Sequence, residues 1–326
     1  MIALASQARV RQAPELGLNA PGLRSRYPSI MHAMHIYQIL NHYTSRQGLD
    51  PGFKVLDNSL NERPDWFEYW PIRSFLLNEA LDEDAFYGFL SPKFQLKTSL
   101  NSDVVRESIL AADAAADVIL LSPSIHNSAY YLNVFEHGDA EHPGLKNVAQ
   151  RLFERLGLPN DLDSLVSDSR NTVFSNYFIA KPRFWRAWLA INEKMFAIAE
   201  TPSDALGEAL RTPTSYRGGS TVQMKIFIME RIATWLLTSD RSFAARVRDP
   251  FVARSRIYKL PVAIVCDALK IAYATQGRAQ YKDVFLLVRG LRKFLNLQIR
   301  LGGALGWRRV GPCLRVLKSY RLEAER

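Results

Sequence analysis

Cysteine is scarce in this sequence of 326 residues, which contains only Cys266 and Cys313. Two cysteines cannot build a disulfide framework or a cysteine-rich zinc site. Long apolar runs are missing as well, since stretches such as 260–265 are far shorter than the roughly 20 residues that cross a bilayer. The N-terminal residues also lack the apolar stretch of a signal peptide. These absences predict a cytoplasmic protein.

Several common catalytic and nucleotide-binding motifs are absent too. The sequence contains no G-x-x-x-x-G-K-[ST] phosphate loop and no G-x-G-x-x-G after the first expected strand. It has neither G-x-S-x-G nor H-E-x-x-H. The sequence therefore lacks the usual signatures of P-loop NTPases, dinucleotide-dependent enzymes, α/β-hydrolases and zinc proteases.

Positive charge is plentiful but unevenly placed. The formal net charge is +10, yet residues 1–240 hold 23 Lys and Arg against 27 Asp and Glu. Residues 241–326 hold 19 Lys and Arg against 5 Asp and Glu, so the last quarter of the chain is strongly basic. Such asymmetry predicts two regions with different tasks, of which the basic one would meet an anionic membrane surface or a nucleic acid.

Hydrophobic periodicity predicts strands alternating with helices up to about residue 180, and helices alone after it. The expected strands cover 35–40, 53–56, 86–90, 117–121 and 173–180. The expected helices cover 64–81, 102–115 with Ser102 as N-cap, 143–156, 182–200, 222–237, 250–275, 280–301 and 304–321, with a break at Gly302-Gly303. This order predicts an α/β fold with a mainly parallel, helix-covered sheet over 34–240. A flexible leader would cover 1–33, and a basic α-helical extension would cover 241–326.

The segment 57–73, DNSLNERPDWFEYWPIR, combines carboxylates, amides, guanidinium groups and four aromatic rings directly after an expected strand. Open α/β sheets place ligand-binding groups at the carboxyl ends of their strands. Carboxylates accept hydrogen bonds from sugar hydroxyls, and arginine binds phosphate. The alternative is a helix whose aromatic side chains lie in the core. The candidates for binding a base or a sugar are Asp57, Asn58, Asn61 and Arg63, and the carboxylates that could act as bases are Asp65 and Glu68.

Three further places combine polar groups with apolar surroundings. Lys93 and Lys97 follow an expected strand end and would neutralise a diphosphate, or else belong to a solvated turn. Asn176-Tyr177 lies in an otherwise apolar strand, where a buried amide needs a partner or a ligand. Glu230 next to Arg231 in an apolar helix is either a structural ion pair or a catalytic carboxylate. Three acidic segments, HGDAEH at 137–142, Asp82-x-Asp84 and Asp161-x-Asp163, favour polar loops or surface turns over metal sites.

Six segments together resemble a known group of proteins: HIYQILNHYT, LDNSLNERPDWFEYWPIR, FYGFLSPKFQLKT, NVFEHGDAEHPGL, RNTVFSNYFIAKPRFWRAWL and KIFIMERIATWLL. They are similar to an uncharacterised bacterial family from polysaccharide-biosynthesis loci and, more distantly, to the GT-A glycosyltransferases of capsule and O-antigen clusters. The resemblance covers roughly 34–240. It implies a GT-A-like fold, a nucleotide-sugar donor, and a glycan or lipid-linked acceptor.

Within that resemblance, the first strands hold the nucleotide, which implies roles for Asp57, Asn58, Asn61 and Arg63. The family's Asp-x-Asp, which holds Mn²⁺ or Mg²⁺ on the diphosphate, is replaced by Ser91-Pro92-Lys93. The resemblance therefore leaves the need for a divalent metal open and predicts no metal ligand, with Lys93 and Lys97 stabilising the leaving group.

The remaining positions of the resemblance concern the sugar and the acceptor. Asn176 and Tyr177 would lie beside the donor sugar. Glu230 would be the base that accepts the acceptor's proton, with Asp65 and Glu68 as rivals.

Three functions follow from these observations. The first is a glycosyltransferase resting on the inner membrane through basic helices in 280–321, where apolar and cationic side chains alternate. The second is a catalytically inactive GT-A-like scaffold of a polysaccharide assembly complex, because the acidic pair is missing. The third, a nucleic-acid-binding protein, lacks any named recognition module, so no nucleic acid is expected. The amphipathic stretch consists of Phe285, Leu286, Leu291, Phe294, Leu295 and Leu301 with Arg289, Arg292, Lys293 and Arg300.

Overall fold

The computed structural model describes residues 33–42, 46–112, 114–122, 128–216, 219–248 and 260–305. The leader expected over 1–33 and the helix expected over 304–321 lie almost wholly outside these ranges. The first ten residues of the helix expected over 250–275 lie outside them too.

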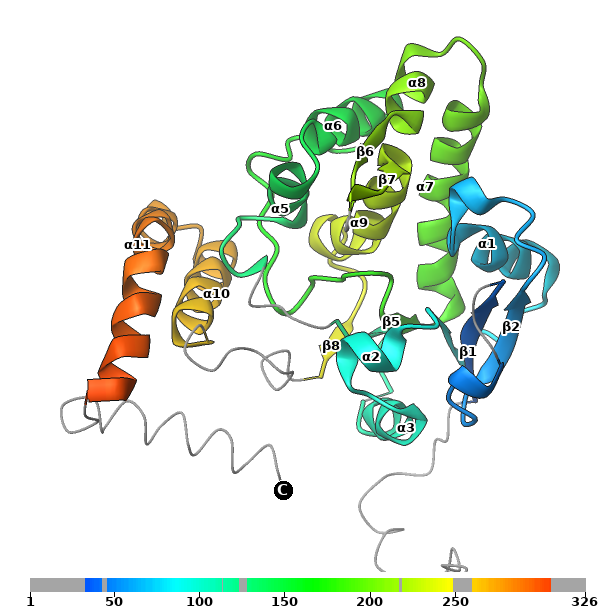
Figure 1. Ribbon diagram of the computed structural model, residues 1–326, viewed down its shortest axis with the longest axis horizontal. Helices are drawn as coiled ribbons and strands as arrows, with labels where there is room; N and C mark the ends of the chain where they lie inside the picture. The colour runs from blue at the N-terminus through cyan, green and yellow to red at the C-terminus, as the bar shows by residue number, and fades with distance from the viewer. Residues whose placement is uncertain are drawn as a thin grey trace, which may run out of the picture. The chain divides into compact units, whose positions relative to one another are not determined.

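A six-stranded sheet forms the centre of the fold (Figure 1), in the order β2-β1-β3-β5-β4-β8. Its strands are β1 (Met34–Asn41), β2 (Lys54–Asn58), β3 (Phe86–Leu90), β4 (Val118–Leu120), β5 (Phe178–Ala180) and β8 (Ala245–Val247). β1 is parallel to β2 and β3, and β4 is parallel to β8, whereas β5 is antiparallel to β3 and β4. The expected α/β fold with a mostly parallel sheet is confirmed.

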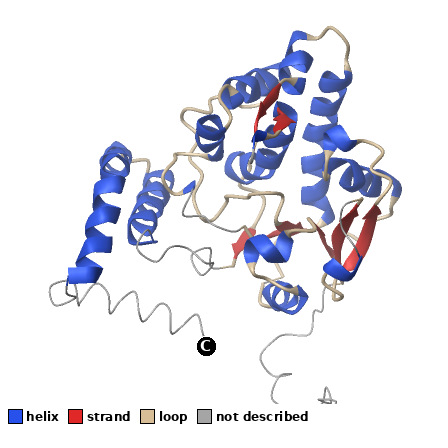
Figure 2. Ribbon diagram, in the orientation of Figure 1, coloured by secondary structure: helices blue, strands red, loops and turns tan. Residues whose placement is uncertain are grey.

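Helices cover both faces of this sheet (Figure 2). Side chains that alternate along each strand join two separate apolar clusters. In β5, Phe178 packs into the larger cluster with α7 and α9, while Ile179 packs into the smaller one with α2 and α3. The helices are α1 (Tyr69–Asn78), α2 (Phe94–Thr98), α3 (Ser102–Leu110), α5 (Val134–Glu141), α6 (Leu145–Arg155), α7 (Pro182–Glu200), α8 (Ala205–Arg211), α9 (Met224–Ser239), α10 (Leu260–Gln276) and α11 (Ala279–Leu305).

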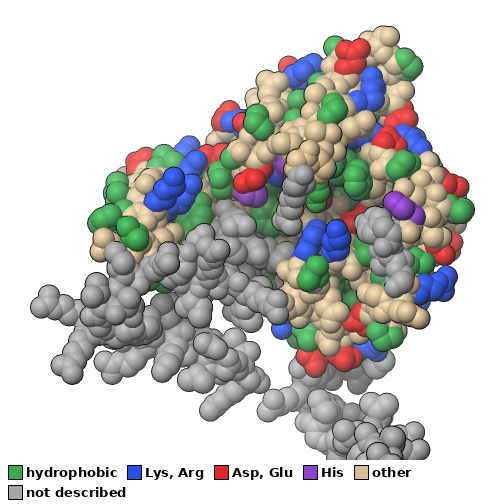
Figure 3. Space-filling model, in the orientation of Figure 1, with side chains coloured by type: hydrophobic (Ala, Val, Ile, Leu, Met, Phe, Trp, Pro, Cys, Tyr) green, Lys and Arg blue, Asp and Glu red, His purple; other side chains and the backbone are tan. Residues whose placement is uncertain are grey.

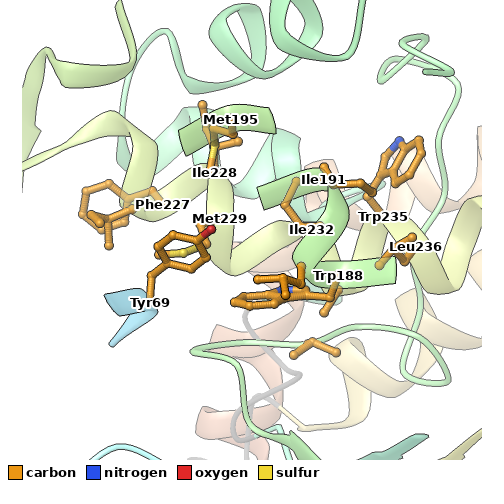
Figure 4. Packing of buried hydrophobic residues seen from close by; sticks show 14 of the residues in the cluster. Tyr69, Trp188, Ile191, Met195, Phe227, Ile228, Met229, Ile232, Trp235 and Leu236 are labelled. Atoms are coloured by element: carbon orange, nitrogen blue, oxygen red, sulfur yellow. The ribbon is translucent and has the colours of Figure 1, made fainter. Parts of the chain in front are cut away.

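The centre of the larger cluster is the contact between α7 and α9 (Figure 4). Trp188 and Met195 of α7 meet Ile228 and Ile232 of α9, all at most 2% exposed. α9 is buried on every side over most of its length. Any charged side chain on such a helix is costly to bury and therefore needs a partner or a function.

Close side-chain packing between neighbouring strands requires glycine at one position of the sheet. A Cβ at Gly88 of β3 would lie 2.9 Å from Ile179 on the neighbouring strand β5. Only glycine leaves room for that side chain, which explains the interruption of the apolar run FYGFL.

Several expected boundaries are wrong, each for a local reason. The strand expected from 173 begins only at Phe178, because Ser175 and Asn176 have φ of 53° and 54°. The helix expected from 64 is split at Phe67, where φ is 48°, into a 3-10 helix Pro64–Trp66 and α1. The N-cap of α3 is Asn101, whose side chain accepts the N–H of Val104, and not Ser102.

The sequence pattern also missed short elements. These are the 3-10 helix Arg46–Gly48, α2, α5, α8, β8 and a two-stranded ribbon of β6 (Pro213–Ser215) and β7 (Thr221–Gln223). The sheet extends past the boundary expected at residue 240, since β8 pairs with β4. α11 continues through Gly302-Gly303, so the expected break there is wrong.

The basic C-terminal helices α10 and α11 pack against each other and against the segment 129–132. Cys266 of α10 and Phe285 of α11 are fully buried in this small cluster together with Ala129. Among the residues that the structure describes, no helix is both long and apolar enough to cross a membrane.

Candidate functional site

One edge of the sheet collects the polar residues predicted from the sequence. The parallel strands β1, β2 and β3 end there, and the antiparallel strand β5 begins there. Asn41 and Asn58 pair at the ends of β1 and β2, Ser91 directly follows β3, and Tyr177 directly precedes β5. This is the edge where open α/β sheets bind ligands.

Tyr177 and Ser91 form the buried floor of this edge. The Oγ of Ser91 lies 2.6 Å from the Oη of Tyr177. The side-chain amide of Gln38 donates to the Ser91 carbonyl at 3.3 Å, which holds the end of β3 against β1. Phe94 of α2 packs edge-on against the Tyr177 ring, with centroids 5.1 Å apart. Ser91 therefore orients the Tyr177 side chain.

Two lysines lie over this floor. Lys93 is the residue before α2 and Lys97 lies within it, both exposed at the surface. The Lys97 ammonium lies 5.4 Å from the centroid of the Tyr177 ring and donates to the Ser175 hydroxyl at 3.4 Å. Figure 3 shows basic side chains gathered over α2. Two exposed ammonium groups beside a strand end suit the binding of an anion such as a diphosphate.

Glu68 and Glu230 are brought together with these lysines. The pKa of Glu68 is raised to about 7, chiefly by burial and also by the charge of Glu230, while Lys97 and Lys93 oppose the rise. Burial also raises the pKa of Glu230, against the pull of Arg231 and Lys97. Both side chains are half-buried, and neither forms a hydrogen bond or ion pair with another described residue. Two such carboxylates are suited to accepting protons near neutral pH.

The two alternatives predicted for Glu230 are separated by the position of Arg231. The Arg231 guanidinium donates to the carbonyls of Val134, at 2.8 Å, and of Phe227, at 2.5 Å. It forms no ion pair with a described residue, so Glu230 stays without its expected structural partner. A Cβ at Gly138 of α5 would lie 2.5 Å from the Arg231 Nε, so this glycine is what admits the buried guanidinium.

Asn176 supplies an unused acceptor in the same group. Its Oδ1 is buried and makes no hydrogen bond with any described residue. The left-handed backbone at Ser175 and Asn176 places the amide at the sheet edge before β5 starts. Left-handed non-glycine residues are uncommon, and Asn is among those that tolerate this conformation. A buried acceptor without a partner is a natural position for a hydroxyl of a ligand.

Arg63 and Asp65 belong to a different network. Arg63 donates to Asp65 at 3.0 and 3.1 Å and to Glu200 at 2.8 Å, and Lys225 donates to Asp65 at 2.7 Å. Trp66 donates to the same Glu200 oxygen at 2.9 Å. Burial acts to raise the pKa of Asp65, but Arg63 and Lys225 outweigh it and lower that pKa. Asp65 is therefore a charged structural partner that joins the start of α1 to α7 and α9.

Asp57, Asn58 and Asn61 lie at the same sheet edge, but on the outer strand β2 and the turn after it. Asp57 is exposed, accepts the Ser59 N–H at 2.9 Å and pairs with Arg46 at 3.4 Å. The Asn58 amide donates to Asn41 at 3.3 Å. Asn61, with φ of 48°, closes the turn by donating its N–H to the Asn58 carbonyl at 3.1 Å. The side chains of Asp57 and Asn58 therefore have local structural partners, and Asn61 shapes the turn through its backbone.

The sequence reasoning missed two aromatic residues near this group. Tyr216, at the end of β6, is 44% exposed and close enough to Tyr177 to raise its pKa. His142 stacks on Phe227 of α9 with ring centroids 3.6 Å apart, and its Nδ1 lies 2.9 Å from the Ser215 carbonyl. The ribbon of β6 and β7 thus borders the carboxylate pair. Aromatic residues in loops give no periodic signal, which explains the omission.

The segment HGDAEH was expected to be a polar loop, but residues 137–141 lie in α5, so that prediction is wrong. Its acidic residue Asp139 and the two Asp-x-Asp segments have structural partners. Asp139 accepts the N–H groups of Gly144 and Lys146 at the start of α6, at 3.1 and 3.0 Å. Asp82 accepts the Asp84 N–H at 3.0 Å, and Asp163 pairs with Lys146 at 2.5 Å. In the described ranges no three His, Cys, Asp or Glu side chains lie together as metal ligands would.

Comparison with protein-family models, with curated proteins and with solved structures gives no match for this chain. The group defined by Glu68, Glu230, Lys93, Lys97, Asn176 and Tyr177, which we call the carboxylate–lysine site, therefore rests on its own geometry and chemistry.

Proposed function

We propose that this protein is a GT-A-like glycosyltransferase. It would move a sugar from a nucleotide-diphospho-sugar donor to a glycan or lipid-linked acceptor in the biosynthesis of a bacterial surface polysaccharide. The observation that supports this most directly is the meeting of two half-buried glutamates, which have no hydrogen-bond or ion-pair partner among the described residues, with two exposed lysines at the sheet edge. A transfer of this kind needs a base for the acceptor and positive charge for the leaving diphosphate.

In the proposed reaction, Glu230 accepts the proton of the acceptor hydroxyl. The acceptor oxygen forms a bond to the anomeric carbon of the donor sugar, and the bond from that carbon to the diphosphate oxygen breaks. The bonding electrons leave with the nucleoside diphosphate, whose charge Lys93 and Lys97 neutralise. Burial raises the pKa of Glu230, which makes it a stronger base, and the charge of Glu230 in turn raises the pKa of Glu68.

The remaining residues would position the sugar. The free Asn176 Oδ1 accepts a hydroxyl of the donor, and Tyr177, held by Ser91, supports the ring from below. Asn58 and Asp57 lie farther along the same edge, on β2, and would border the nucleoside. Ser91-Pro92-Lys93 offers a hydroxyl and an ammonium where a divalent ion would need carboxylates. The negative charge of the diphosphate would therefore be neutralised by the two lysines.

Nucleotide binding tests the first half of this proposal. We expect one of UDP, GDP or dTDP to raise the melting temperature of the wild type in a thermal-shift screen with and without Mn²⁺. Lys93→Ala and Lys97→Ala should reduce the rise. Lys194→Ala should leave it unchanged, because Lys194 lies exposed on α7. If no nucleotide stabilises the protein, the transferase proposal fails.

Turnover tests the second half. With the donor named by the screen, Glu230→Gln should lower kcat by about 10²- to 10⁴-fold while keeping nucleotide binding. Glu208→Gln, an exposed site on α8, is the matched control and should be neutral. Equal turnover in Glu230→Gln and wild type would remove Glu230 as the base and leave Glu68 to be tested in the same way.

The inactive GT-A-like scaffold is favoured by one observation, the replacement of the acidic pair by Ser91-Pro92-Lys93. A scaffold would bind no nucleotide, or would bind one without hydrolysing or transferring its sugar. Detection of free nucleotide diphosphate from any donor sugar, lost in Glu230→Gln, distinguishes the enzyme from the scaffold.

A further inference from the structure

α11 has two apolar faces, and among the described residues only one of them packs against other parts of the fold. Phe285, Val288 and Leu295 pack into the cluster with Tyr130 and Cys266, and Phe285 is fully buried. The amphipathic stretch expected over this part of the chain is therefore divided. Some of its apolar residues pack α11 against α10 and the segment 129–132, and others are exposed.

The opposite face of α11 carries a stripe of exposed apolar side chains. Leu287, Leu291 and Phe294 follow one another at helical spacing and are 61%, 46% and 58% exposed. Leu286 and Leu297 widen the stripe at 43% and 48% exposed. Elsewhere in the described residues, large exposed apolar side chains such as Leu60, Leu77 and Leu96 are far apart in the sequence. A contiguous apolar patch on a helix marks an interaction surface.

Cations accompany this stripe. Lys293 is exposed one helical turn before Leu297, and Lys282 lies one turn before Leu286. Arg289 and Arg292 face the body instead, where Arg289 pairs with Glu136 at 2.6 Å and Arg292 lies 5.4 Å from the Tyr130 ring centroid. Asp283 is the one acidic residue among 279–305. Figure 3 shows hydrophobic and basic side chains together over α11.

We propose that the exposed stripe of α11 binds an anionic lipid surface, with the helix lying in the plane of the headgroups. Residues 278–326 hold 12 Lys and Arg against 3 Asp and Glu, which complements a negative leaflet and opposes pairing with a second copy of this chain. Leucine and phenylalanine in the stripe suit the acyl boundary and have no role on a phosphate backbone. This inference does not depend on the transferase proposal.

Flotation of the full chain with vesicles tests it. We expect the protein to float with vesicles of 70% phosphatidylcholine and 30% phosphatidylglycerol, and far less with phosphatidylcholine alone. Leu291→Asp and Phe294→Asp should each lower the apparent affinity by about tenfold. Lys293→Glu should lower it by at least about fivefold. Leu77→Asp, at an exposed leucine of α1, is the matched control and should bind like the wild type.

Circular dichroism of each variant confirms that the fold is kept, so a loss of flotation reports the surface alone. Absence of flotation with anionic vesicles overturns the proposal. Equal flotation of wild type and Leu291→Asp overturns it as well. A wild-type dimer in sedimentation that Leu291→Asp dissociates, without lipid binding, would assign the stripe to a second copy instead.

Discussion

At the scale of single residues, Glu68 couples the site to stability. Its pKa is raised to about 7 in the folded protein, first by burial and then by Glu230, from an ordinary value of 4.5. The folded state therefore favours the protonated side chain more than the unfolded chain does. Between pH 4.5 and 7 the unfolded chain loses its proton first, so stability falls as the pH rises through this range.

We predict that Glu68→Gln removes this pH dependence. The free energy of unfolding of the variant should equal that of the wild type near pH 4.5 and exceed it by about 3 kcal/mol at pH 8. Urea unfolding at pH 5, 6, 7 and 8 measures the difference. The free energy of unfolding of the control variant Glu208→Gln should change with pH in the same way as that of the wild type. A constant difference across the series would contradict the raised pKa.

A pair of glycines gives a second prediction at this scale. Gly138 and Gly290 both lie inside helices, where alanine ordinarily stabilises by about 0.5–1 kcal/mol. At Gly290 nothing lies within 4 Å of a new Cβ, whereas at Gly138 the Arg231 guanidinium does. We expect Gly290→Ala to stabilise and Gly138→Ala to destabilise by about 1–3 kcal/mol. Melting temperatures of the two variants give the comparison, and stabilisation by both would contradict the close packing around Arg231.

At the scale of elements, α9 shows how a buried helix accommodates charge. Lys225 is held by Asp65 at 2.7 Å and lies 3.9 Å from the centroid of the Trp66 ring. Arg231 is satisfied by backbone carbonyls. Only Glu230 has neither arrangement, which separates it from Asp65 as a candidate base.

The Asp65–Lys225 pair should therefore affect folding more than chemistry. Asp65→Asn leaves a buried ammonium without its carboxylate and should cost about 3 kcal/mol. The double variant Asp65→Asn/Lys225→Met should cost less than the sum of the two single variants, with a coupling of about 1–3 kcal/mol by urea unfolding. Nucleotide stabilisation should persist in the double variant. Additive costs would show that the two residues act separately.

The sequence predicted long, strongly patterned elements and failed where backbone conformation or distant pairing decides. α7 and α9 were expected nearly at their observed bounds, because the composition and length of an apolar helix are enough to predict it. β8 has three residues and depends on pairing with β4 far away in the sequence. Positive φ at Ser175 and Asn176 shortened β5, and no periodicity reveals such a turn.

The site shows the same division. Glu68 and Asp65 are three residues apart in one polar segment, and the sequence could name both without ranking them. The split at Phe67 directs Asp65 into the network of Arg63 and Lys225, whereas Glu68 interacts with Glu230. Residue type thus named both carboxylates as candidate bases. Only the fold shows that Asp65 is ion-paired while Glu68 has no ion-pair partner among the described residues.

At the scale of the whole molecule, the basic C-terminal helices are part of one compact unit with the sheet. Their docking depends on Lys270 of α10, which is buried and donates to the carbonyls of Ser128, Tyr131 and Ser167 at 3.1, 3.0 and 2.7 Å. One ammonium thereby satisfies acceptors from two separate segments. Burial lowers the pKa of Lys270 to about 8, with Asp267 and Asp168 opposing the change.

Replacing this lysine should release the helices without unfolding the sheet. In Lys270→Met the Tyr131 and Ser167 carbonyls lose this donor, while the Ser128 carbonyl keeps the Tyr131 N–H at 3.0 Å. Each group left buried and unsatisfied costs about 1–3 kcal/mol. We expect amide exchange to accelerate in α10, α11 and 128–132, while β1, β3 and α7 keep wild-type protection. Lys293→Met, at an exposed lysine of α11, is the control and should leave exchange unchanged. Nucleotide stabilisation should survive in Lys270→Met, because the carboxylate–lysine site draws no residue from α10 or α11. Uniform acceleration over the sheet would instead show that the helices and the sheet unfold as one cooperative unit.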